Sequence, residues 1–140
     1  MSDTQPSADS ERESNARILA VVVYALYLLA LANGLTAIAG VVVAYIKRGD
    51  AKGTPYYGHF SAAITTFWVV LIAGALLVAL TLQLVFGTLL FYQHPVADIA
   101  WHPSVMAVLP LIWLGFVVLL IFYLYRTIKG LVRAVEGRPY

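Results

Sequence analysis

Apolar side chains run almost without interruption through three stretches of the chain, and short polar segments separate them. The three stretches are Ile18–Ile46, Ala62–Phe91 and Val105–Leu124. A membrane-spanning helix needs about 20 apolar residues, because the hydrocarbon core is about 30 Å thick and a helix rises about 1.5 Å per residue. The pattern therefore predicts three transmembrane helices, and we expect them at about 18–46, 62–91 and 109–128.

The limits of the first and third spans need separate reasoning. The first would extend about 43 Å as one helix, so it tilts, continues into the headgroups or is interrupted near Asn33 and Gly34. The third stretch contains Pro110, and proline is best tolerated in the first turn of a helix. We therefore expect the third helix to begin near Pro110, after a partly helical segment at residues 96–108.

The composition supports an all-α integral membrane protein. The chain is 61% hydrophobic and only 11% charged, whereas soluble domains contain about 25% charged residues. Within lipid only helices and closed barrels satisfy the backbone, and the continuous apolar runs lack the alternation of barrel strands. Residues 1–17 differ because they are rich in Ser, Asp and Glu, and this composition predicts a disordered N-terminal tail. The membrane domain would then cover residues 18–140.

The distribution of basic residues predicts an orientation. The seven that follow the first or third span are Lys47, Arg48, Lys52, Arg126, Lys129, Arg133 and Arg138. The N-terminal tail holds only Arg12 and Arg17, together with four acidic residues. With three crossings, the positive-inside rule predicts a cytoplasmic first loop and C-terminus and an N-terminus outside. A cleaved signal peptide is the competing interpretation, but the apolar run continues to Ile46, beyond the small residues at 30–32.

Aromatic residues lie near the predicted ends of the spans. Tyr24 and Tyr27 lie near the outer end of the first span, and Tyr45 lies at its inner end. Trp68 opens the second span, and Tyr123 lies at the exit of the third. Tyr and Trp favour the headgroup region because they combine an apolar ring with a polar edge. We interpret these side chains as interface anchors rather than as a ligand site.

Small residues recur every four positions within the first two spans. The two stripes are Ala32, Thr36, Gly40 and Ala44 in the first span, and Ala75, Ala79, Gln83 and Gly87 in the second. Small side chains let membrane helices approach closely, and amides such as those of Asn33 and Gln83 then form hydrogen bonds between helices. The stripes predict packing seams within one chain or between copies. The alternative interpretation is the lining of a polar pathway.

Candidate chemistry is sparse. His94, Asp98 and His102 have a spacing that would suit a metal on a continuous helix, but Pro95 and Pro103 limit any such helix, so the site is a weak candidate. We expect no cofactor. The sequence has no evident nucleophile–base pair and no phosphate-binding loop, so we do not expect an enzyme.

The basic residues of the tail favour a lipid partner. Arg126, Lys129 and Arg133 share one face if the last helix continues, and cations near a membrane surface bind anionic headgroups. The net charge of only +2 gives no reason to expect nucleic-acid binding.

Several short motifs occur in an order that resembles a known family. The motif residues are Arg48, Asp50, Ala51, Gly53, Thr54, His59, Phe60, Thr66, Phe67, Trp68, Arg126 and Gly130. With the closing residues Glu136–Tyr140, they resemble the Tic-twenty-like small bacterial membrane proteins of unknown function. That family is distantly similar to a subunit of the chloroplast inner-envelope translocon. The resemblance covers residues 18–140 and implies a three-span protein of the bacterial inner membrane, without an established activity.

Two functional hypotheses follow from these observations. The first is a structural or accessory subunit that packs against itself or a larger membrane complex. It is favoured because the spans carry small-residue stripes and no charges. The alternative is a subunit of an oligomeric transporter, channel or protein-translocation pore, lined by Asn33, Thr36 and Gln83.

Overall fold

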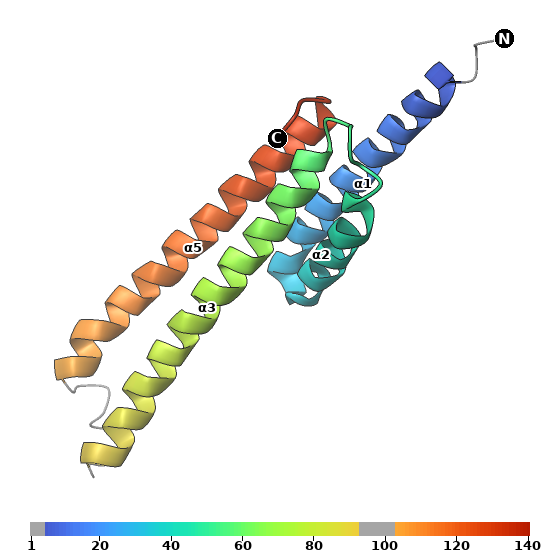
Figure 1. Ribbon diagram of the computed structural model, residues 1–140. Coiled ribbons are helices and arrows are strands. Elements are labelled where there is room, and N and C mark those ends of the chain that lie inside the picture. Colours follow the sequence, from blue (N-terminus) through green and yellow to red (C-terminus); the bar gives the residue numbers. More distant parts are fainter. Residues whose placement is uncertain (1–4, 93–102) are drawn as a thin grey trace. The chain divides into compact units, whose positions relative to one another are not determined.

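The computed structural model describes residues 5–92 and 103–140, and every regular element in these ranges is an α-helix. The helices are α1 (Gln5–Asn33), α2 (Leu35–Arg48), α3 (Tyr57–Tyr92) and α5 (Pro103–Val135), drawn in Figure 1. Three of them are long and apolar enough to cross a membrane, over Ala8–Asn33, Tyr57–Thr88 and Val105–Val135. The prediction of an all-α membrane protein with three such helices is confirmed.

The chain forms two compact units. Unit 1 comprises Met1–Trp68 and Tyr123–Tyr140, and unit 2 comprises Val69–Phe122. Unit 1 therefore contains α1, α2, the first turns of α3 and the last turns of α5. Unit 2 contains the remaining parts of α3 and α5.

The first apolar stretch is two helices rather than one. Gly34 separates α1 from α2 and has a φ of +70°, a conformation that glycine adopts without the steric penalty of a side chain. Asn33 supports the new helix, because its Oδ1 accepts hydrogen bonds from the Thr36 backbone N–H at 3.2 Å and from the Thr36 hydroxyl at 3.3 Å. Of the three alternatives left open for the first span, the structure shows the interruption near Asn33 and Gly34.

Helices α1 and α2 pack side by side as a hairpin (Figure 1). The contact depends on small residues of α2. Ala44 is fully buried, and a Cβ added to Gly40 would lie 2.8 Å from the Tyr27 ring. Gly40 therefore belongs to a packing seam within the chain. The predicted stripe is not continuous, because Gly34 places Ala32 on a different helix from Thr36 and Gly40.

Residues 5–17 are helical, which corrects the predicted disorder for this part of the N-terminal tail. Helix α1 begins at Gln5. Ala16 and Ala20 are buried, and the Arg17 guanidinium donates a hydrogen bond to the Val135 carbonyl of α5. Packing of this face within unit 1 stabilises the helix, which the polar composition alone does not predict.

The hairpin also changes the predicted positions of the N-terminal turns and the first loop. Arg12 of α1 and Lys47 and Asp50 of the first loop line the same hollow in unit 1. The N-terminal turns and the first loop therefore lie together, and the prediction that they occupy opposite sides of the membrane finds no support. The physical reason is the reversal at Gly34, which returns α2 toward the beginning of α1.

In unit 2, the apolar segments of α3 and α5 pack against each other at glycine positions. A Cβ on Gly115 would lie 2.9 Å from Leu77, and one on Gly74 would lie 3.8 Å from Leu119. Helix α5 begins at Pro103, so the expectation that the third helix starts near Pro110 was wrong. Pro110 lies within the helix near its N-terminus, where its missing N–H removes one hydrogen bond while the rest of the helix continues.

Candidate functional site: a tyrosine cluster around His59

The loop between α2 and α3 is ordered by local contacts among the motif residues. Lys47 forms an ion pair with Asp50 at 3.2 Å, and the Thr54 hydroxyl donates to the Ala51 carbonyl at 2.8 Å. Gly53 has a φ of +86°, which favours glycine at that turn. Arg48 donates from Nη2 to the Tyr57 hydroxyl at 3.0 Å and lies over the Tyr57 ring. These contacts order the loop and thereby fix the position of the first turns of α3 within unit 1.

His59 is the buried centre of the motif region, with only 1% of its surface exposed. Its Nε2 lies 2.8 Å from the Arg138 carbonyl oxygen. A carbonyl can only accept, so Nε2 carries the proton and donates, and in the neutral ring Nδ1 is then an acceptor. Three tyrosine rings surround the imidazole: Tyr24, Tyr56 and Tyr140 have centroids 5.9, 5.8 and 5.6 Å away. We call these four residues the His59 cluster.

Two tyrosines of α1 hold that helix against the beginning of α3. The Tyr24 hydroxyl donates to the His59 carbonyl at 3.2 Å, and the Tyr27 hydroxyl donates to the Ala63 carbonyl at 2.9 Å. The Tyr123 hydroxyl of α5 in turn donates to the Tyr27 carbonyl. All three tyrosines are at most 8% exposed. Their interpretation as interface anchors was wrong, because their hydroxyls bond to backbone carbonyls inside unit 1.

Two other predicted anchors remain at the surface. Tyr45 and Trp68 are 50% and 46% exposed, and the Trp68 indole donates to the Tyr45 hydroxyl at 2.8 Å. The Phe67 ring packs edge-on against Trp68. Thr66, on the neighbouring face, is buried and donates to the Ala62 carbonyl at 2.7 Å. The Thr-Phe-Trp motif therefore has one buried side chain and an exposed aromatic one.

The C-terminal segment completes the cluster. Gly130 lies so close to Tyr24 that an added Cβ would overlap the phenol ring. Gly137, at φ +71°, turns the chain after α5, and Tyr140 then lies against both His59 and the Arg126 guanidinium, which is 5.7 Å from the ring centroid. The structure thus brings together motif residues from the first loop and from the end of the chain. The sequence indicates these motifs separately and does not predict that the loop and the end of the chain are in contact.

The His59 cluster joins several elements of unit 1. Within the described part of the chain, the buried His59 Nδ1 has no hydrogen-bond partner. Among the described residues, tyrosine rings and the Arg138 carbonyl lie against the imidazole, and the Tyr24 hydroxyl donates to the His59 carbonyl. The cluster connects α1, α3, α5 and the C-terminal residues.

The small-residue stripe of α3 lies on the outer surface of unit 2. Ala75, Ala79 and Gln83 are all exposed, and no atom of the described residues lies within 4 Å of a Cβ added to Gly87. Leu77, two positions from Ala75 and Ala79, faces α5 instead. In the first stretch, Asn33 at the end of α1 accepts hydrogen bonds from Thr36 in the first turn of α2. The stripe of the first stretch therefore contributes in part to packing within the hairpin. The stripe of α3 packs against no other element among the described residues.

The weak metal candidate of His94, Asp98 and His102 lies outside the described residues. In residues 5–92 and 103–140, no group of three His, Cys, Asp or Glu residues could hold a metal ion. Two of the cations that are predicted to bind lipid headgroups contact tyrosine rings. Arg126 lies over Tyr140, and Lys129 lies 5.6 Å from the Tyr125 ring centroid.

No family model matches the chain, and no curated protein or solved structure matches it. Its function is therefore argued from its own residues.

Removal of the last aromatic side chain should loosen the His59 cluster. Because the Tyr140 ring contacts both His59 and Arg126, we expect Tyr140→Ala to lower the free energy of unfolding by about 1–2 kcal/mol. Tyr125→Ala is the matched control, since Tyr125 is 60% exposed, and its effect should be smaller. Unfolding in mixed micelles, followed by circular dichroism, measures the difference. Equal losses for the two variants would mean that Tyr140 does not stabilise the cluster.

Proposed function

We propose that the chain is a multi-pass membrane protein whose first apolar stretch enters and leaves the bilayer on one side. Helix α1 as a whole is long enough to cross, over Ala8–Asn33, but its first turns are charged. Its uncharged part, residues 18–33, extends only about 24 Å, and the 14 residues of α2 extend about 21 Å. Both are shorter than the hydrocarbon core of about 30 Å. Helices α3 and α5, with 36 and 33 residues, extend about 50 Å each and are long enough to cross.

The charge distribution supports this topology. With a re-entrant hairpin and two crossings, the N-terminal turns, the first loop and the C-terminus share one side. That side then carries all nine Lys and Arg residues of the chain, whereas three full crossings would divide them. By the positive-inside rule, this side is cytoplasmic.

We further propose that the protein is a structural or accessory subunit that packs against another membrane helix, from a second copy or from a larger complex. The observation that carries this proposal is the exposed stripe of Ala75, Ala79 and Gln83 on α3. Among the described residues, nothing hydrogen-bonds to the Gln83 amide, and an amide in the hydrocarbon gains about 1 kcal/mol from an interhelical partner. Small neighbours on the same face permit the close approach that such a bond requires.

Two other ideas have weaker support. A transporter, channel or translocation-pore subunit would use Asn33 and Thr36 as lining, but these residues bond to each other at the hairpin turn. Membership of the Tic-twenty-like family, and with it a bacterial inner-membrane location, rests on the motif residues alone. The contact of His59 with Tyr140 and of Gly130 with Tyr24 gives those motifs a shared structural role.

The assembly state in lipid tests the accessory role. We expect native mass spectrometry of protein in nanodiscs to detect a homo-oligomer or a co-purifying membrane protein. Gln83→Leu should weaken that association about fivefold, since one interhelical amide bond contributes about 1 kcal/mol, and Ala79→Leu should weaken it further by blocking close approach.

Leu82→Ala is the control for these two variants, because Leu82 is exposed but lies off the stripe. It should leave the association unchanged. A wild-type protein that is monomeric and has no partner in native-like lipid would contradict the proposed role.

A further inference from the structure

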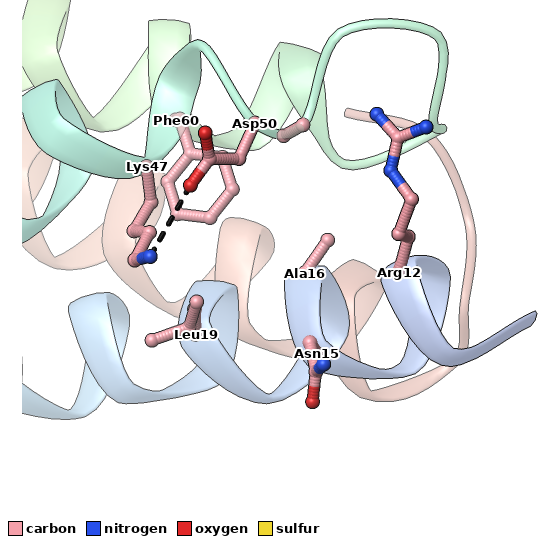
Figure 2. A pocket seen from close by; sticks show the side chains of 8 residues that line it. Arg12, Asn15, Ala16, Leu19, Lys47, Asp50 and Phe60 are labelled. Atoms are coloured by element: carbon pink, nitrogen blue, oxygen red, sulfur yellow. Dashed lines mark hydrogen bonds and ion pairs between the residues drawn. The ribbon is translucent and has the colours of Figure 1, made fainter. Parts of the chain in front are cut away.

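Unit 1 contains a hollow of about 320 Å³ between α1 and the segment that connects α2 to α3 (Figure 2). Arg12, Ala16 and Leu19 line it from α1. Lys47, Asp50 and Phe60 line it from the end of α2, the loop and the beginning of α3. Binding pockets for small ligands measure about 300–1,000 Å³, so the hollow suits a compact chemical group rather than a large ligand.

The rim of the hollow is polar and carries a net positive charge. Lys47 and Asp50 form an ion pair at 3.2 Å, drawn as a dashed line in Figure 2. Arg12 is exposed, and no ion pair within the described residues includes it. With two cations and one carboxylate, the rim retains one uncompensated positive charge. An anionic group would therefore be attracted to it, and the carboxylate would accept a hydrogen bond from a neighbouring hydroxyl.

The floor of the hollow is apolar. Phe60 is fully buried and Ala16 is 6% exposed, while Leu19 is half-buried. A cationic rim above an apolar floor is complementary to a ligand that joins a charged group to hydrocarbon. A free inorganic anion would use only the rim.

We propose that this hollow binds the glycerophosphate group of an anionic phospholipid between Arg12 at one end and Lys47 and Asp50 at the other, with the two cations attracting the phosphate and Asp50 accepting from a headgroup hydroxyl. A soluble glycerophosphate has the same polar chemistry and is the other source of this group. The proposal does not depend on the accessory role, because the stripe on α3 contributes nothing to the hollow.

Lipid binding by the full-length protein tests the proposal. Native mass spectrometry in a neutral detergent, with phosphatidylglycerol or phosphatidylcholine titrated in, measures the dissociation constants. We expect a preference for phosphatidylglycerol, and we expect the double variant Arg12→Gln/Lys47→Gln to bind it about 25-fold more weakly, at about fivefold for each cation. Soluble glycerophosphate serves as competitor: effective competition identifies a soluble ligand of this class, and failure to compete identifies the lipid.

Two further variants separate a pocket from diffuse surface charge. Lys52→Gln removes an exposed lysine of the same loop that does not line the hollow, and it should change the dissociation constant less than twofold. Ala16→Leu leaves the charge unchanged but fills the hollow, and it should weaken phosphatidylglycerol binding. Circular dichroism checks that each variant is folded, and Arg12→Lys should retain binding. Unchanged binding by the folded double variant, or an equal loss in Lys52→Gln, would overturn the proposal.

Discussion

A single added methyl group at Gly130 should destabilise unit 1 more than any other conservative change in the last helix. We expect Gly130→Ala to lower the free energy of unfolding by about 2–3 kcal/mol, the range for overpacking a site that has no space. Gly87→Ala, also in a helix, should instead be neutral or stabilising by up to about 1 kcal/mol, because alanine favours the helical backbone over glycine.

The difference arises from what the new methyl group meets. At Gly130 it would overlap the ring of Tyr24, which is 2% exposed. That ring cannot move away easily, since its hydroxyl bonds to the His59 carbonyl and the two rings form a T-shaped contact. At Gly87 the methyl group would meet nothing within 4 Å.

Unfolding in mixed micelles of increasing denaturing detergent compares the two variants with the wild type. Tryptophan fluorescence and circular dichroism report the transition. If Gly130→Ala is as stable as Gly87→Ala, Tyr24 is free to rearrange, and the close packing of α1 against α5 does not stabilise unit 1.

The helical class of this protein could be predicted because it depends on local composition. Long apolar runs in lipid must satisfy their own backbone, and a helix does this without contacts to other segments. The limits of the helices depended on finer effects. The reversal at Gly34 results from one residue at φ +70°, while the sequence on both sides of it is apolar.

The His59 cluster could not be predicted for a different reason. Its contacts join residues far apart in the chain, such as His59 with the Arg138 carbonyl and with the Tyr140 ring. Tyrosine near the end of an apolar stretch has the same pattern whether it faces lipid headgroups or a buried carbonyl. The motif residues did indicate where specific contacts would occur, but not which partners they would have.

Cysteine labelling should place both ends of the first apolar stretch on one side of the membrane. The chain contains no cysteine, so single-cysteine variants can be made directly. We expect Asp9→Cys, Lys52→Cys and Arg138→Cys to react with a membrane-impermeant maleimide only in inside-out vesicles. Pro103→Cys, at the beginning of α5, should react only in right-side-out vesicles, because α3 has crossed the bilayer before it.

The turn of the hairpin supplies the sharpest comparison. Leu35, at the beginning of α2, is 72% exposed within the chain, so protein packing does not shield it. If the hairpin re-enters the bilayer, lipid surrounds this position, and Leu35→Cys should remain unlabelled from either side until detergent is added. Val135→Cys, at the end of α5 and 49% exposed, should label from the cytoplasmic side and shows that the reagent reaches helical positions.

Each topology leaves a different pattern of labelling. A single crossing by residues 18–46 would make Asp9→Cys react together with Pro103→Cys, on the side opposite Lys52→Cys. A hairpin lying flat on the surface would leave Asp9→Cys on the expected side but expose Leu35→Cys to the reagent. Only re-entry combines one-sided labelling of both hairpin ends with a protected turn, because in that topology the chain reverses at Gly34 before it has crossed the hydrocarbon core.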